Sequence, residues 1–223
     1  GETVYEYNRV NALTSLVNRK EAQVLSTYAY TYYLDGNQRT KQDHSGRLTS
    51  YTYDGLGRLL REAERGAADA LTKGYSYDAA GNRQTMTVSG AESYTVSYGY
   101  DRSNRLLQSS KTEQGVEALT EYYYDGNGNQ TAVLVSSLTS AGSDPAKTAL
   151  ERNTAGVSLY TYDGFDRLVR VENEGGVSEY SYRPDGLRHA KTVDGKTLTG
   201  IWEGTNLGME IPSDGIAARQ YYY

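Results

Sequence analysis

Cysteine is absent from this chain of 223 residues, and proline, phenylalanine and tryptophan are nearly so. The lack of cysteine excludes a disulfide scaffold and any cysteine-based zinc site. Long apolar runs are also missing: the longest clean run covers residues 132–135, whereas a transmembrane helix needs about 18–20 residues. With a formal net charge of -5 and a pI of about 5.2, the chain also lacks the basic face of a nucleic-acid binder. We therefore expect neither a membrane span nor nucleic acid as a partner.

Aliphatic side chains are scarce as well. Leu, Ile, Val and Phe together make up fewer than one residue in five, and a fraction below roughly 20% favours disorder when net charge is high. The charge here is modest, and the chain contains 23 Tyr and 24 Gly. Since a buried aromatic ring removes about 150–250 Å² from water, tyrosine is expected to supply the missing apolar area.

A repeat accounts for most of these tyrosines. Its pattern is Tyr-x-Tyr-Asp-x-x-Gly-Asn/Arg, as in Tyr51-Thr-Tyr53-Asp54-Gly-Leu-Gly57-Arg58. Copies recur roughly every 20–25 residues, with two longer steps, and repeats of this length are typical of arrays in which each unit stacks on its neighbours. The expected structural members of the motif are Tyr51, Tyr53, Asp54, Gly57, Tyr75, Tyr77, Asp78, Gly81, Tyr98, Tyr100, Asp101, Tyr122, Tyr124, Asp125, Gly128, Tyr160, Tyr162 and Asp163. Weaker copies begin at Tyr5, Tyr30 and Tyr180.

One copy of the motif predicts a strand, a turn and a second strand. Tyr-x-Tyr places two rings on the same face of a strand, because side chains alternate. The second Gly, or the Asn that replaces it, falls where a bulged turn requires a positive φ; these positions are Gly57, Gly81, Asn104 and Gly128. Tyrosines in register across the array are expected to form aromatic ladders.

The predicted fold class is all-β: repeated β-hairpins forming a spiralling antiparallel sheet, as an arc or part of a hollow shell. We expect a single array over residues 1–223, with about eight or nine units and an incomplete last one. Residues 136–156 are predicted to form a loop insertion. The segments 61–73 and 144–152 are rich in helix-forming residues and are read as loops with one helical turn at most.

The motif resembles the RHS or YD-repeat family, and the resemblance extends from Tyr5 to the end of the chain. The segment Leu198–Ile211, with its turn Ile201-Trp202-Glu203-Gly204, is similar to the divergent unit near the end of such arrays. The resemblance implies a spiral antiparallel sheet wound into a hollow shell. Bacterial members include polymorphic toxins, wall-associated proteins and cocoon subunits of insecticidal toxin complexes, and teneurins use a similar shell for adhesion.

Two departures qualify what the resemblance implies. The units are too few for a closed cocoon, so a fragment or an open arc is expected. The Asp-Pro-Gly-rich segment that supports self-cleavage in the family is missing, and the one Asp-Pro here is Asp144-Pro145. We therefore expect neither autoproteolysis nor toxicity from this chain.

No catalytic site, metal site or cofactor is predicted. The two histidines, His44 and His189, lie beside expected turns and are read as surface residues. Asp125-Gly-Asn127-Gly-Asn129 starts like a calcium loop, but Gln130 and Ser136 stand where such a loop needs a Gly and an acidic residue. The chain is therefore not expected to be an enzyme.

The function predicted from these observations is structural: a β-repeat segment of an RHS-type shell that encloses or presents another polypeptide, such as a C-terminal toxin. The alternative is an extracellular adhesion module that binds glycan or protein through exposed tyrosines. Expected partners are the rest of the shell and the enclosed polypeptide, with glycans as a further option. Unpaired sheet edges also predict edge-to-edge self-association. The expected location is extracellular or the bacterial cell surface.

Overall fold

The computed structural model describes residues 1–140, 150–215 and 219–221. The chain divides into two compact units, Gly1–Glu117 and Ala118–Tyr223, which are taken separately below. In the described part of both units the regular structure is entirely β, as predicted. No helix there is long and apolar enough to cross a membrane.

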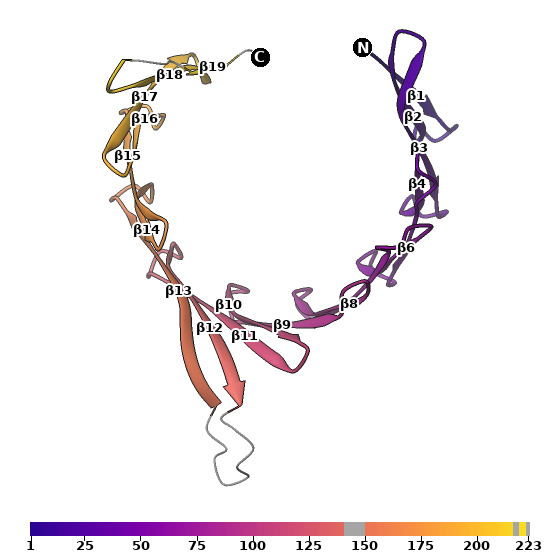
Figure 1. The fold of residues 1–223 in the computed structure, drawn as a ribbon, viewed down its shortest axis with the longest axis horizontal. Coiled ribbons are helices and arrows are strands. Elements are labelled where there is room, and N and C mark those ends of the chain that lie inside the picture. The colour runs from indigo at the N-terminus through magenta and orange to yellow at the C-terminus, as the bar shows by residue number, and fades with distance from the viewer. Residues whose placement is uncertain (141–149, 216–218, 222–223) are drawn as a thin grey trace. The chain divides into compact units, whose positions relative to one another are not determined.

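Unit 1 is a run of antiparallel hairpins (Figure 1). Each strand pairs with the strands before and after it in sequence, from β1 through to β10. The strands are β1 (Glu2–Tyr7), β2 (Leu13–Lys20), β3 (Gln23–Tyr32), β4 (Gln38–Asp43), β5 (Leu48–Tyr53), β6 (Leu59–Arg65), β7 (Leu71–Tyr77), β8 (Arg83–Gly90), β9 (Tyr94–Tyr100) and β10 (Leu106–Glu113).

Unit 2 continues the same pattern. Strand β11 (Val116–Tyr124) starts two residues before the boundary, and from β12 to β19 each strand again pairs antiparallel with its sequence neighbours. These strands are β12 (Gln130–Ser140), β13 (Leu150–Tyr162), β14 (Leu168–Asn173), β15 (Gly176–Tyr182), β16 (Arg188–Val193), β17 (Lys196–Glu203), β18 (Asn206–Pro212) and β19 (Arg219–Gln220).

Few side chains are fully buried, because within each unit the sheet is one layer thick. The buried apolar residues are Ala63, Val88 and Val96, while the motif tyrosines are half-buried. Val88 and Val96 lie on the same face as the tyrosines, since Val88 pairs with Tyr94 and side chains alternate along a strand. The opposite face carries paired hydroxyls, such as Ser76 with Thr85 at 2.6 Å.

Two expectations about local structure are wrong. Residues 61–73, read as a loop, lie largely in β6 and β7, and residues 136–140 and 150–156, within the expected insertion, extend β12 and β13. The rest of the insertion and most of 144–152 lie outside the described residues. The helix formers of β6 are overridden by pairing on both sides, with β5 and with β7, because tertiary context outweighs intrinsic propensity.

Candidate functional site

The turn edge of the hairpins is built around the motif aspartate. The Asp54 carboxylate accepts hydrogen bonds from the backbone N–H groups of Leu56 and Arg58, both at 2.9 Å. It also forms an ion pair with Nε of Arg58 at 2.7 Å. The backbone N–H of Asp54 donates to the carbonyl of Arg58, and that of Gly57 donates to the carbonyl of Asp54. Asp54 thus closes a five-residue turn, which explains why an aspartate stands directly after Tyr-x-Tyr.

The same turn recurs at the other predicted aspartates. In each, the carboxylate accepts the N–H of the residue four positions on, and the side chain of that residue, Asn or Arg, bonds the second carboxylate oxygen. These pairs are Asp78–Asn82, Asp101–Arg105, Asp125–Asn129 and Asp163–Arg167. Asn8 replaces the aspartate in the first turn and accepts the N–H of Val10 and Ala12.

These hydrogen bonds favour the charged carboxylate. The pKa of Asp54 is held below its usual range, first by the backbone N–H of Arg58. The pKa of Asp101 is lowered in the same way by Arg105. For Asp78, Asp125 and Asp163 the largest cause of the lowered pKa is the side chain four residues on. The turn carboxylates are therefore structural anions.

The residue three positions after the aspartate has a positive φ, as predicted. Gly57, Gly81 and Gly128 have φ of 77°, 91° and 93°, and Asn104, in the same slot, has 61°. Asp166 fills the slot after Asp163, with φ 58°. Glycine adopts this conformation without the cost that other L-residues bear.

Within each unit, hairpins are tied to the one before through the second tyrosine of the motif. Its hydroxyl donates to the backbone carbonyl of the first residue of the return strand in the preceding hairpin. The pairs are Tyr32–Leu13 (2.7 Å), Tyr53–Gln38 (2.9 Å), Tyr77–Leu59 (2.8 Å), Tyr100–Arg83 (3.0 Å), Tyr162–Gln130 (3.0 Å) and Tyr182–Leu168 (2.8 Å). This tyrosine also stands at the β-bulge of its own hairpin, so its position along the ladder is fixed.

Trp202 occupies the same slot in the divergent hairpin β17–β18. Its Nε1–H donates to the carbonyl of Arg188 at 2.9 Å, and it stands at a register shift between Ile201 and Trp202. Sequence reasoning identified the divergent unit and missed this equivalence. The signal that could have revealed it is chemical: indole and phenol are the two large rings with a polar hydrogen at the tip.

The expected ladders of stacked tyrosine rings are not what joins the hairpins. The ring pair Tyr33–Tyr53 is in contact edge-on, at 6.3 Å and 89°, and is not a stacked pair. Cationic side chains lie over several rings instead, such as Arg58 over Tyr77 at 4.7 Å and Arg167 over Tyr182 at 4.9 Å. Equivalent tyrosines stand two strands apart, about 9.5 Å, beyond the ~4.5–7 Å at which rings interact, so a long basic side chain fills the interval.

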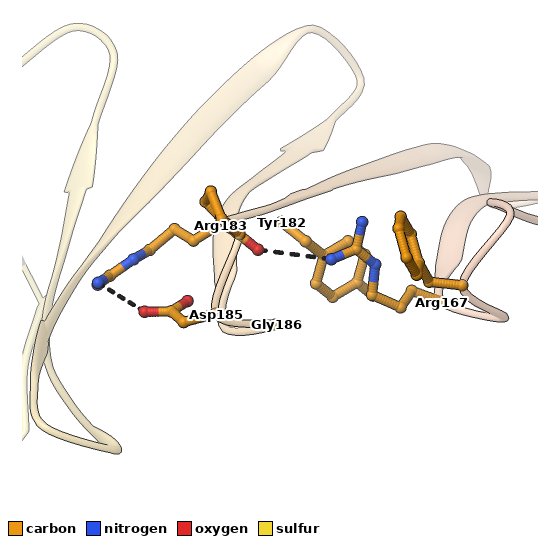
Figure 2. Close-up of a pocket in the computed structure, with 7 residues that line it drawn as sticks. Arg167, Tyr182, Arg183, Asp185 and Gly186 are labelled. Atoms are coloured by element: carbon orange, nitrogen blue, oxygen red, sulfur yellow. Dashed lines mark hydrogen bonds and ion pairs between the residues drawn. The ribbon is translucent and has the colours of Figure 1, made fainter.

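Figure 2 shows this arrangement at the last tyrosine turn. The guanidinium of Arg167 lies against Tyr182 and donates to the carbonyl of Arg183 at 3.4 Å. Arg183 in turn pairs with Asp185 at 2.7 Å. These residues line a cavity of about 630 Å³. Phe165, which is 80% exposed, also borders it, and the guanidinium of Arg167 lies 5.0 Å from the centre of its ring.

The first tyrosines of the motif have a different role. Tyr51, Tyr75, Tyr98, Tyr122 and Tyr160 are half-buried within the strands. Arg83 lies over Tyr75 at 5.0 Å and over Tyr98 at 5.9 Å, joining two hairpins. Burial raises the pKa of Tyr51 and of Tyr75, with the charge of Glu62 adding to it.

The remaining candidates are the two histidines and the string that resembles a calcium loop. His44 and His189 are both exposed, as expected. Over residues 1–140, 150–215 and 219–221, no group of three His, Cys, Asp or Glu is placed to hold a metal ion. The amide of Asn127, part of the calcium-like string, donates to the carboxylate of Asp166.

Comparison with known proteins gives a structural likeness. A scan against protein-family models found no match, and a search of the curated proteins found none either. Among solved structures, the crystal structure of TcdB2-TccC3-TEV matches with a TM-score of 0.55 at 15% identity, and that of TcdB2-TccC3 without hypervariable C-terminal region with 0.52 at 16%. Each match covers 94% of this chain and 14% of the other. The chain thus shares the fold of a small part of these proteins, which agrees with the RHS/YD-repeat resemblance of its sequence.

Proposed function

We propose that this chain is a structural β-repeat segment of an RHS-type shell, which encloses or presents another polypeptide such as a C-terminal toxin and carries out no chemistry of its own. One observation carries the proposal: in seven hairpins the polar tip of the second aromatic, tyrosine or tryptophan, bonds the backbone of the hairpin before it. Such bonds let a sheet grow one hairpin at a time without a second layer to pack against. The wall of a hollow shell, which is one sheet thick, needs hairpins joined in this way.

The chemistry of the turn edge supports the same role. The aspartates accept backbone N–H groups within their own turns and the arginines bridge to the next turn. Carboxylates and guanidiniums engaged in this way hold the array together, which supports a structural role.

The adhesion alternative has less support. A sugar-binding platform needs ring faces open to the ligand, and the rings of Tyr77 and Tyr182 each have a guanidinium over them. The partners that follow from the proposal are the rest of the shell and the polypeptide it encloses. The proposed location is extracellular.

The experiment exploits the absence of cysteine. Ser109→Cys places a thiol on the tyrosine face, since Ser109 pairs with Tyr98, and Ser97→Cys places one on the opposite face. Both variants are labelled, in the protein that carries this chain, with a maleimide on a polymer too large to enter a closed compartment. A shell predicts that one face is labelled and the other is protected until the protein is unfolded. Equal labelling of both faces in the folded protein would refute the shell.

A further inference from the structure

Arg58 and Arg167, from the turns that follow β5 and β13, fill the place above the second tyrosine ring of the next hairpin. The residue four positions after the turn aspartate is arginine there: Arg58 lies 4.7 Å over Tyr77, and Arg167 lies 4.9 Å over Tyr182. Each guanidinium also donates to the carbonyl of the residue following that tyrosine, at 3.4 Å. A ring face and an adjacent carbonyl therefore form a recurrent receptor for a guanidinium.

Three hairpins have asparagine at the position of that arginine, namely Asn37, Asn82 and Asn129, and asparagine is shorter and carries no charge. Asn82 and Asn129 bond turn residues of the next hairpin, Asn104 and Asp166. Asn37 bonds Asp35 in its own turn at 3.0 Å. Among the described residues no Lys or Arg lies over the ring of Tyr53, the tyrosine that follows Asn37 in the next hairpin.

A cavity of about 460 Å³ lies at this ring, between the two turns. Tyr33 and Tyr53 form two of its walls, with their rings at 89°. Both rings are held in place because their hydroxyls donate to backbone carbonyls, that of Tyr33 to Tyr51 and that of Tyr53 to Gln38, each at 2.9 Å. The receptor is therefore preorganised, which lowers the entropy lost on binding.

The rest of the lining suits a cation on an aliphatic stem. Asp35 and Asp54 contribute carboxylates, and Asp35 is exposed. Leu34, fully exposed, offers apolar surface at the rim. The pKa of Tyr53 is raised, by burial first and then by the charges of Tyr33 and Asp35. Nearby negative charge disfavours the ionised phenol, so the raised pKa agrees with a negative environment in the cleft. Two positive charges lie nearby: Arg58 pairs with the Asp54 carboxylate at 2.7 Å, and the guanidinium of Arg39 lies 5.8 Å over Tyr33, so Asp35 is the carboxylate left to face a bound cation.

We propose that this cleft, the Tyr53 cleft, binds the guanidinium side chain of an arginine from another polypeptide. The bound guanidinium lies above the ring of Tyr53, as Arg58 lies above the ring of Tyr77. Asp35 balances its charge, and Leu34 packs against the aliphatic part of the arginine. Arginine is favoured over lysine because the planar guanidinium stacks on a ring while it donates hydrogen bonds in its plane. The proposal goes beyond the shell role and holds whether or not the array encloses a cargo.

The test is a titration of the chain with N-acetyl-arginine amide, followed by NMR shifts of the ring protons of Tyr53 and Tyr33. The control ligand is N-acetyl-citrulline amide, which has nearly the same shape and no charge. We expect saturable shifts with the arginine derivative, and we expect the citrulline derivative to bind at least about fivefold more weakly. Equal shifts with both ligands would overturn the proposal.

Three variants extend the test. Asn37→Arg lets the chain fill its own cleft, as Arg58 does in the next hairpin, and is expected to weaken binding at Tyr53 about tenfold. Arg58→Asn vacates the place over Tyr77 and should create a second responding ring there. Asp35→Asn, which removes the charge and keeps the size of the exposed side chain, should weaken binding, at the loss of one acceptor for Asn37. Undiminished binding by Asn37→Arg, in a variant whose spectrum shows the native fold, would refute the assignment.

Discussion

Removing one hydroxyl measures how strongly a hairpin is tied to its neighbour. In Tyr77→Phe the ring stays in place beneath Arg58, and the one bond lost is the donation to the carbonyl of Leu59 at 2.8 Å. A neutral hydrogen bond contributes about 0.5–1.5 kcal/mol net. Since Leu59 is only half-buried, water can reach the freed carbonyl, so the cost should lie near 1 kcal/mol.

The assay is native-state hydrogen exchange, because a repeat array opens locally and a single melting temperature would average over its hairpins. A loss of about 1 kcal/mol corresponds to roughly fivefold faster exchange, expected in β6–β8 and not in distant hairpins. The matched control is Tyr123→Phe: Tyr123 is 47% exposed, faces away from the motif tyrosines, and its hydroxyl bonds no described residue. If the two variants exchange alike, the hydroxyl does not tie the hairpins together.

Further predictions concern the turns and the lone tryptophan. Gly57→Ala, at φ 77°, should lower the free energy of unfolding by about 1 kcal/mol. Gly55→Ala, where an added Cβ meets no atom within 4 Å, should be near neutral, and denaturant titration of the pair decides; equal effects would contradict the role of φ. Because the pKa values of Asp54, Asp78, Asp101, Asp125 and Asp163 are lowered in the fold, their stabilisation is complete above the unfolded pKa near 3.9 and is lost as pH falls through the lower folded values. Unfolding measured from pH 7 to pH 2 should show this loss, and Asp78→Asn should reduce its slope; an unchanged slope would count against the turn carboxylates. Trp202→Phe should make amide hydrogen exchange in the β16–β17 region about fivefold faster. Trp202→Tyr, which restores a polar hydrogen at the ring tip, should recover part of the protection. Equal exchange rates in the two variants would argue against the hydrogen bond to Arg188.

The period of the sequence was enough to predict the hairpin, its face and the glycine that needs a positive φ. Alternation along Tyr-x-Tyr fixes which side chains share a face, and the slot of Gly57 follows from turn geometry alone. Both depend on residues close together in the sequence, where local rules are reliable.

What the sequence could not supply depends on the distance between hairpins. The hydroxyl of Tyr77 donates to a backbone carbonyl 18 residues away. Every residue has such a carbonyl, so the sequence does not indicate which one is the acceptor. The expected ring ladder was wrong because equivalent rings are separated by two strand spacings, a distance that arginine spans and a phenol does not. The strands within 61–73 and 136–156 are likewise set by pairing with neighbours rather than by their own composition.

Hairpin length and hairpin spacing are independent in this fold. Tyr162 reaches Gln130 across 32 residues, whereas the other tyrosine ties span 14–19, yet its bond of 3.0 Å is like the others because the extra residues lengthen β12 and β13 away from the turn edge. Such an array can accept new sequence at the far end of any hairpin without disturbing the succession of aspartate turns. It is a scaffold on which arms of chosen length can be displayed.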